Sequence, residues 1–294
     1  MKLKNPFRGL GVAIVTPFDE TGCVDYTALR QLVNDIIENG ADFLCALGTS
    51  AETPTLSDDE KSLVLKTIIA VNNGRLPLLL GCGTNNTIQV CEYIQTADLT
   101  GVDGFLLVVP YYNKPRAEGL YQHYKTIAEV SPLPIILYNV PGRTGVNMQP
   151  DTVIRLAQDC DAIVGIKEAS GNLDQAKAII DNVGEGFDVL SGDDGNACDM
   201  IALGAKGVIS VIGNAFTGEF AQAVHHALKG EDELAQTKNQ RLAELIRLTM
   251  ADGNPAGIKA MLKVLGRIKG GLRLPLVEVT EATRQQIETQ IKEL

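Results

Sequence analysis

The sequence has few of the side chains that usually hold a structural metal ion. It contains three histidines, two of which are adjacent (His225 and His226), and six scattered cysteines that form no Cys-x-x-Cys pair. Zinc sites draw their ligands from such residues at close spacing, so we expect no metal site. Most of the cysteines lie within apolar stretches, as buried thiols do, which indicates reduced thiols and a cytoplasmic protein.

Long runs of one residue class are missing too. No window approaches the ~20 apolar residues of a membrane-spanning helix. The first apolar run, residues 12–15, is too short for the core of a signal peptide. The net charge is -10 and there is no long basic run, so neither nucleic acid nor an anionic membrane surface is an expected partner. We therefore expect a protein that is neither secreted nor embedded in a membrane.

Short apolar runs recur along the chain and predict the strands. Each has ~5–8 residues and is continuously apolar rather than alternating, which is typical of parallel strands buried on both faces. The predicted strands are 12–18, 43–48, 76–83, 104–110, 133–140, 162–168, 187–193 and 208–214.

The segments between these runs have the periodicity of helices. Asp25 is a candidate cap for the first, and Ser57 with Glu60 fits a capping box at the second. The predicted helices are 25–40, 57–68, 87–101, 117–129, 150–159, 173–182, 197–203 and 219–228.

Eight strands that alternate with eight helices predict an α/β fold, a (β/α)8 TIM barrel. A doubly wound open sheet is the main rival, but it rarely carries so many even units. Its nucleotide fingerprint, Gly-x-Gly-x-x-Gly, does not follow the first strand, and Gly81-Cys82-Gly83 lacks the rest of that pattern. We expect a barrel that needs no cofactor.

No strand pattern remains after Gly230. Helices are predicted at 234–250, 255–266 and 280–294, with breaks at 252–255 and 270–275. The chain therefore divides into a barrel domain, residues 1–230, and a C-terminal three-helix extension, residues 231–294. We expect the extension to serve packing and oligomer contact.

A lysine closes the sixth apolar run, at Lys167. Burial at the end of a strand favours the neutral amine, which attacks a carbonyl to form a Schiff base. Gly165 lies two residues earlier, and its missing side chain is expected to leave room for a ligand. The alternative is a surface lysine at a strand edge, paired with Glu168.

Polar residues follow the other strands at their carboxyl ends, which share one rim of a barrel and carry its active site. They are Thr49, Ser50, Tyr111, Tyr112, Tyr138, Arg143, Asp193 and Asp194. Together with Lys167 they suit imine chemistry, since a phenol can move protons and a guanidinium can grip a carboxylate.

Each of these residues also has a structural alternative. Tyr138 could fill the core, and Thr49 and Ser50 could cap the next helix. Arg143 could be a solvated loop charge. For Asp193-Asp194 we favour a helix cap over a metal site.

At these residues the chain resembles the dihydrodipicolinate synthase family, within the pyruvate-dependent class I aldolases that include N-acetylneuraminate lyase. Gly48-Thr49-Ser50-Ala51-Glu52 is similar to the family's Gly-x-x-Gly-Glu element. Tyr138-Asn139-Val140-Pro141 with Arg143-Thr144-Gly145 is similar to its tyrosine motif, and Gly165-Ile166-Lys167-Glu168 to its Schiff-base motif. The resemblance runs from about residue 7 to 214 and continues more weakly to the end.

The resemblance implies a role for each matching residue. Lys167 would form the imine with pyruvate, and Tyr138 would be the proton donor and acceptor. Thr49 and Tyr112 would complete a proton relay, with Tyr112 reaching in from a neighbouring subunit.

Four further residues would bind substrate. Ser50 and the backbone of Ile209 would hold the pyruvate carboxylate, Arg143 would bind L-aspartate 4-semialdehyde, and Gly192 would line the substrate site. The product would be the hydroxylated tetrahydrodipicolinate of the diaminopimelate route to lysine. Members of the family are commonly homotetramers, built as a dimer of dimers.

Two departures and two alternatives remain. Ala51 replaces the usual glycine, and Ser50 stands where threonine is common, but neither change removes a proton-carrying group. A sugar-acid lyase on the same scaffold is one alternative, although such lyases usually lack the arginine at Arg143. A catalytically silent binding protein is the other, and the intact set of polar residues argues against it.

The resemblance also implies a candidate allosteric pocket for L-lysine at a dimer interface. The matching positions are Asp58, Lys61, Asn85, Gln89 and Tyr111. Gln89 stands where lysine-sensitive relatives have a glutamate, and Lys61 adds like charge. We therefore expect insensitivity to L-lysine, unless Asp58 replaces the missing carboxylate.

Overall fold

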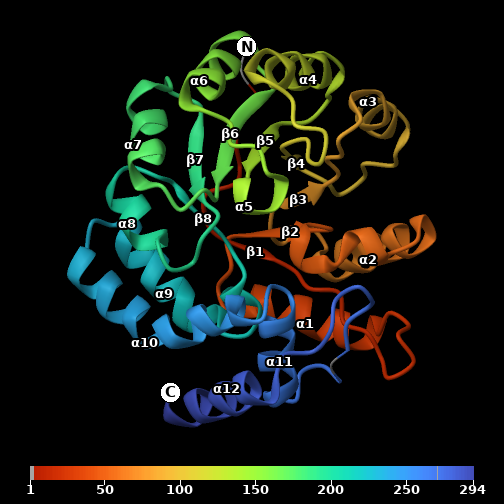
Figure 1. Ribbon diagram of the computed structural model, residues 1–294, viewed down its shortest axis with the longest axis vertical. Helices are drawn as coiled ribbons and strands as arrows, with labels where there is room; N and C mark the ends of the chain where they lie inside the picture. Colours follow the sequence, from red (N-terminus) through yellow and green to blue (C-terminus); the bar gives the residue numbers. More distant parts are fainter. Residues whose placement is uncertain (1–2, 270) are drawn as a thin grey trace.

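Eight parallel strands close into a barrel in the computed structural model, which describes residues 3–269 and 271–294. Each strand pairs with its sequence neighbours, and β1 closes the ring by pairing with β8. Helices surround the strands (Figure 1). The strands are β1 Gly9–Ala13, β2 Phe43–Ala46, β3 Leu78–Gly81, β4 Gly104–Val108, β5 Ile135–Asn139, β6 Ile163–Glu168, β7 Asp188–Ser191 and β8 Gly207–Ser210.

The predicted helices between the strands are confirmed. Asp25 accepts hydrogen bonds from two backbone N–H groups of the first helix, and Ser57 and Glu60 form the predicted capping box of the second. The outer helices are α1 Tyr26–Glu38, α2 Asp58–Asn72, α3 Thr87–Thr96, α4 Ala117–Val130, α6 Pro150–Asp159, α7 Leu173–Asn182, α8 Ala197–Ala202 and α9 Thr217–Leu228.

Three more helices follow the barrel, as predicted. They are α10 Asp232–Ala251, α11 Ala256–Val264 and α12 Glu281–Glu293. Helix α10 packs along α9 and α8, and α12 packs on α10 and α11 (Figure 1). The domain boundary at residue 230 stays a prediction, and Gly270, in the predicted 270–275 break, lies outside the described residues.

Several predicted boundaries are wrong. The first strand begins at Gly9 rather than at residue 12, so it includes Gly11. A glycine is needed there because an added Cβ would be 2.2 Å from the Phe43 ring, and this packing is not visible in the sequence. Helix α3 ends at Thr96, before the predicted stop at Gly101, because the Asp98 carboxylate binds the backbone of Thr100 and forms a turn. Short helices that were not predicted follow three strands on the rim: η1 Thr49–Ala51, α5 Pro141–Thr144 and η3 Ile212–Asn214.

The core has two layers. One fills the space between the strands and the outer helices, and the other fills the barrel interior and includes Tyr138, Val164 and Ile209. A continuous apolar strand serves both layers at once, because successive side chains point to opposite faces.

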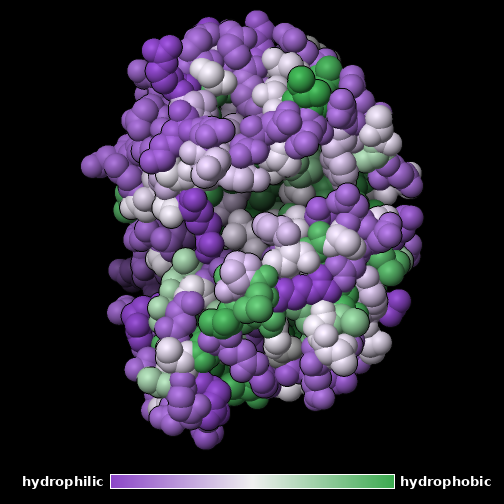
Figure 2. Space-filling view, turned by 45° about the vertical axis from the view of Figure 1, so that its right-hand side comes forward, coloured by the Kyte–Doolittle hydropathy of each residue, from purple (hydrophilic) through white to green (hydrophobic). Residues whose placement is uncertain are grey.

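The outer surface is mostly hydrophilic. Figure 2 shows separate hydrophobic patches on it and a hollow near the middle of the face in view. Among residues 3–269 and 271–294, no helix is long and apolar enough to cross a membrane.

Candidate active site

An irregularity in β6 decides where Lys167 points. The pairing of β6 with β5 shifts by one residue, so Ile135 pairs with Ile163 but Ile136 pairs with Gly165. Ile163 and Ile166 both pack outward against the helices, whereas Val164 packs in the barrel interior. A β-bulge reverses the facing of the residues beyond it. Lys167 therefore points into the barrel, although it is an even number of residues from outward-facing Ile163.

Lys167 lies against Tyr138 at the carboxyl end of the barrel. The two residues pair across β5 and β6, and the Lys167 Nζ is 4.4 Å from the centre of the Tyr138 ring. Lys167 is 5% exposed and Tyr138 is 7% exposed. The interpretation of Lys167 as a surface lysine is therefore wrong.

The surroundings of the amine are compact. An added Cβ on Gly192 would lie 3.0 Å from Lys167 Cε, so the glycine leaves the space that the lysine occupies. Cys45 is fully buried nearby, and burial raises the pKa of its thiol to about 11, against the opposing charge of Lys167. The thiol therefore stays protonated near neutral pH and adds no charge to the site.

The expected role of Gly165 is wrong. An added Cβ there would lie 2.5 Å from the Asp188 carbonyl oxygen and 3.0 Å from Ile136 Cδ1. The missing side chain makes room for the neighbouring strand, not for a ligand.

Glu168 faces the other way, out of the barrel. Its carboxylate accepts hydrogen bonds from Asn139 Nδ2 at 3.0 Å and 3.2 Å, from Gln175 Nε2 at 3.1 Å and from the Ser170 N–H at 2.7 Å. This network fixes the end of β6 to β5 and α7. Glu168 is thus an anchor of the strand that carries Lys167.

The loop after β2 holds Thr49 and Ser50 in a short turn of 3-10 helix. Residues at both ends of the loop have left-handed backbone, Leu47 with φ 53° and Glu52 with φ 54°. Ser50 is buried, and its Oγ accepts a hydrogen bond from Asn254 Nδ2 at 3.0 Å. Neither hydroxyl residue is the cap of α2, which is Ser57, so that alternative is wrong.

Arg143 and Ile209 lie on the same rim. Arg143 is on α5, and its Nη2 donates to the Asn254 carbonyl at 3.3 Å. Ile209 is fully buried on β8 in the barrel interior, in the same cluster as Tyr138. Asn254 therefore bridges the Ser50 loop and the arginine.

Tyr112 does not join the other relay residues within the described chain. It lies in the loop after β4 with φ 73°, and it is 83% exposed. No hydrogen bond is present among the hydroxyls of Thr49, Tyr112 and Tyr138 in the described residues. The structure thus brings Tyr138 to Lys167 and leaves Tyr112 outside.

Asp193 and Asp194 do not cap their own helix, so the predicted role is wrong. Asp194 accepts hydrogen bonds from the backbone N–H groups of Val211 and Ile212, at 3.0 Å and 2.7 Å. Burial raises the pKa of Asp194 to about 6. Asp193 binds Gly195 in its own loop. Asp194 therefore ties the end of β7 to the end of β8, a long-range contact that spacing does not reveal.

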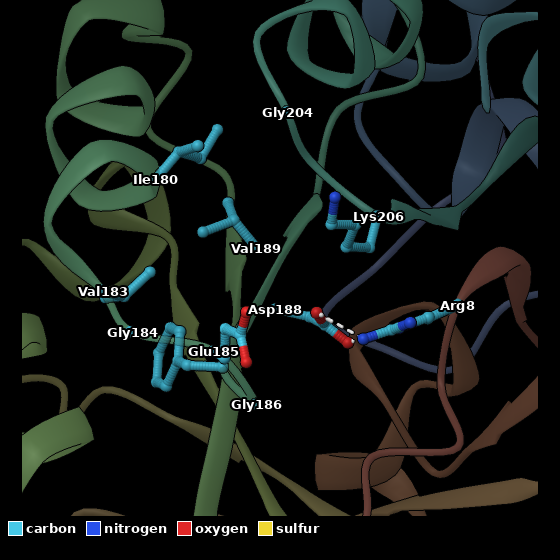
Figure 3. Close-up of a pocket in the computed structure, with 11 residues that line it drawn as sticks. Arg8, Ile180, Val183, Gly184, Glu185, Gly186, Asp188, Val189, Gly204 and Lys206 are labelled. Atoms are coloured by element: carbon cyan, nitrogen blue, oxygen red, sulfur yellow. Dashed lines mark hydrogen bonds and ion pairs between the residues drawn. The ribbon is translucent and has the colours of Figure 1, made fainter. Parts of the chain in front are cut away.

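A cavity of about 530 Å³ lies at the opposite end of the barrel (Figure 3). Asp188, the first residue of β7, lines it and forms an ion pair with Arg8 at 2.8 Å. Glu185 and Lys206 also line the cavity. Lys167 is at the other end of its strand, so this cavity is not part of the rim that carries Lys167 and Tyr138.

Comparison with known proteins identifies the family of this site. The sequence profile of the Dihydrodipicolinate synthetase family matches residues 6–294.

The chain belongs to this family.

A 4-hydroxy-tetrahydrodipicolinate synthase from Phocaeicola vulgatus is 52% identical over 99% of this chain and 98% of its own length. The structure of dihydrodipicolinate synthase from Acinetobacter baumannii complexed with pyruvate is 43% identical, with a TM-score of 0.94 over 97% of this chain and 98% of that one. The structure of the enzyme from Cyanidioschyzon merolae with lysine bound is 36% identical, with a TM-score of 0.94 over 98% of each chain.

The residues that the family resemblance assigned to an allosteric pocket form two pairs. Asn85 Nδ2 donates to the Tyr111 carbonyl at 3.2 Å, and Lys61 Nζ lies 3.0 Å from Asp58 Oδ1. Gln89 is exposed on α3. The Asp58 carboxylate is thus already paired with a cation of its own chain.

Asn254 is the site residue that motif reasoning missed. The sequence marks it only as one residue of the 252–255 break between two predicted helices. Its contact with Ser50 spans 204 positions and its contact with Arg143 spans 111, so no local motif reveals them. Over residues 3–269 and 271–294, no group of three or more His, Cys, Asp or Glu side chains could hold a metal ion.

Proposed function

We propose that the chain is a 4-hydroxy-tetrahydrodipicolinate synthase, a lyase that condenses pyruvate with L-aspartate 4-semialdehyde in the diaminopimelate route of lysine biosynthesis. One observation carries the proposal: the buried Lys167 amine lies 4.4 Å from the Tyr138 ring centre at the catalytic end of the barrel. The name of the Phocaeicola vulgatus relative and the pyruvate complex of the Acinetobacter baumannii enzyme support the substrates.

Lys167 supplies the nucleophile. Its amine attacks the keto carbon of pyruvate, and loss of water gives the imine, which withdraws electrons and eases removal of a proton from the pyruvate methyl group. The resulting enamine attacks the aldehyde carbon of the second substrate. The amino group of that substrate then attacks the imine carbon, which closes the ring and releases the Lys167 amine. Tyr138 is the group placed to move protons at this centre, which contributes roughly 10²–10⁴-fold in general acid–base catalysis.

The remaining rim residues bind the substrates. Ser50, Gly192 and the backbone of Ile209 hold the pyruvate portion, and Thr49 carries protons to Tyr138. Arg143 binds the carboxylate of the semialdehyde, since a guanidinium grips a carboxylate with two hydrogen bonds. This short anionic substrate suits Arg143 better than N-acetylmannosamine, the uncharged second substrate of a neuraminate lyase, does.

We propose a homotetramer, a dimer of dimers, in the cytoplasm. Tyr112 is 83% exposed with left-handed backbone, which suits a residue that a second copy receives into its proton relay. All six cysteines are free thiols, in keeping with a reducing compartment.

We propose that L-lysine does not inhibit the enzyme. A lysine ligand brings an ammonium group, and Gln89 offers it no charge. Asp58 is 99% exposed and already pairs with Lys61 at 3.0 Å, so it is a weak replacement. Loss of a charge-assisted hydrogen bond costs about 1.5–3 kcal/mol, or roughly tenfold or more in affinity.

Reduction of the imine tests the proposal. Borohydride with pyruvate should label one peptide, the one that contains Lys167, and Lys167→Arg should abolish the label because a guanidinium stays protonated. A label on Lys114 or Lys206 would contradict the assignment. A coupled assay with pyruvate and aspartate semialdehyde, run beside pyruvate and N-acetylmannosamine, decides between synthase and sugar-acid lyase.

A further inference from the structure

A buried ion pair joins the C-terminal extension to the loop after β2. The side chains of Lys259, on α11, and Glu52 are 2% and 0% exposed and form a salt bridge. Lys259 Nζ also donates to the Gly271 carbonyl at 3.0 Å, and the Arg273 N–H donates to Glu52 Oε2 at 3.0 Å. The Lys259 ammonium lies 4.1 Å from the centre of the Phe18 ring. Both charged groups are thus enclosed and hydrogen-bonded.

Stability alone does not account for this pair. Two charges lose their hydration on burial, and apolar residues of similar volume are often equally stable in their place. Burial lowers the pKa of Lys259, and the neighbouring Glu52 carboxylate opposes that effect. The charges instead make the contact directional, because a hydrogen-bonded pair fixes α11 and the loop after β2 at one separation and angle.

The element fixed in this way carries two of the site residues. Glu52 ends the segment that begins at Leu47, and Thr49 and Ser50 lie between these two left-handed residues. Non-glycine residues keep such backbone only where their surroundings hold it. At the near end, Thr53 Oγ1 donates to the Gly48 carbonyl at 3.0 Å. At its C-terminal end, Glu52 ties the loop to Lys259 and Arg273, whereas Ser50 is tied separately to Asn254 Nδ2 at 3.0 Å.

Lys167 is held by different contacts. Its strand is anchored by Glu168 through Asn139 and Gln175, which are not part of the Lys259 cluster. A disturbance at Lys259 should therefore reach the hydroxyl of Thr49 before it reaches the amine.

We propose that Lys259 and Glu52 are positioning residues, which set the Thr49 hydroxyl for proton transfer with Tyr138 without taking part in imine formation. The inference rests on the proposed function and assigns a part of the same reaction to the C-terminal extension. A displacement of about 1 Å at such a hydroxyl can lower the rate by as much as ~10²-fold.

The test compares three variants with the wild-type full-length protein: Lys259→Met, Glu52→Gln and the double variant. The double variant removes both charges at nearly constant volume and should recover most of the Tm lost in either single variant. The kcat of the double variant should still fall roughly tenfold or more. The pyruvate concentration that gives half-maximal trapping of the imine by borohydride should stay within about threefold of the wild-type value. Lys263→Met is the matched control, because Lys263 lies on the same helix and forms an exposed ion pair with Glu278 at 3.1 Å. It should leave kcat unchanged.

One more single variant, Glu52→Asp, covers the case in which the double variant does not fold. Glu52→Asp keeps the charge and shortens the tether by one methylene, so kcat should fall with little change in trapped imine. A folded double variant or Glu52→Asp with wild-type kcat would overturn the inference and leave the proposed function intact. A wild-type protein that traps no pyruvate would overturn both.

Discussion

Substitution of Gly192 by alanine adds one methyl group beside the Lys167 side chain. The new Cβ would lie 2.5 Å from the Ala169 Cβ, 3.0 Å from Lys167 Cε and 3.2 Å from the Glu168 carbonyl oxygen. Separations this short cannot persist, so something must move. Ala169 has no side-chain freedom and Glu168 is fixed by its own network, so the backbone at residue 192 must shift, and the flexible Lys167 side chain beside it is displaced as well.

The size of the expected effect follows from the free-energy cost of the added methyl group. One extra methylene-sized group in a packed interior costs about 1–3 kcal/mol, which corresponds to roughly 5-fold to 150-fold in an equilibrium. Because the displaced group is the amine, the loss should appear in imine formation. We expect Gly192→Ala to need roughly 5-fold to 150-fold more pyruvate for half-maximal trapping.

The assay is a pyruvate titration with borohydride trapping, read by mass spectrometry, together with Tm. Gly184→Ala is the control, since an added Cβ there meets nothing within 4 Å. Gly192→Ala with wild-type trapping and wild-type Tm would refute the argument, because it would mean that the methyl group and the amine do not compete for space.

Three substitutions and one titration test the site, its regulation and its stability. Tyr138→Phe should keep its Tm and lose about 10²–10⁴-fold in kcat, and wild-type turnover would contradict the proton relay. Arg143→Ala should raise the KM for the aldehyde and spare the trapped imine; an unchanged KM would point to another anchor. Titration with L-lysine at subsaturating pyruvate should show no inhibition below millimolar concentrations, and a sub-millimolar half-inhibition would disprove this. The Arg273 guanidinium lowers the pKa of Glu60 from 4.5 to about 2, so the pair adds stability above pH 4.5 that is lost as the pH falls toward 2. Arg273→Met should therefore reduce the fall in Tm between pH 4.5 and pH 2, and an unchanged fall would exclude the pair as its cause.

The barrel and its extension could be predicted because their signals are local. Continuous apolar runs mark strands buried on both faces, and Ser57 with Glu60 marks a helix start through contacts within one turn. The rim follows from the fold, because parallel strands present their carboxyl ends together. Lys167 and Tyr138 could be placed on that rim for this reason.

The remaining features depend on contacts distant in sequence. Lys259 and Glu52 are 207 positions apart, and neither has a local pattern that predicts a partner. Asp194 next to a helix start indicates a cap, yet the free N–H groups of the loop after β8 compete for the same carboxylate. Gly165, two residues before Lys167, suggests an open space, whereas the Asp188 backbone fills it. In each case tertiary packing overrides the local signal.

The bulge in β6 shifts by one residue the alternation of inward-facing and outward-facing side chains along that strand. Counting residues in steps of two from Ile163 assigns Lys167 to the outer layer, and the one extra residue corrects the count. A single-residue insertion before Ile163 would be absorbed by the loop, but one between Ile163 and Lys167 would exchange the directions in which Lys167 and Glu168 point. The amine would then face the amides of Asn139 and Gln175, and the Glu168 carboxylate would enter the barrel. The direction of the Lys167 side chain therefore depends on the number of residues in β6 and not only on their identity.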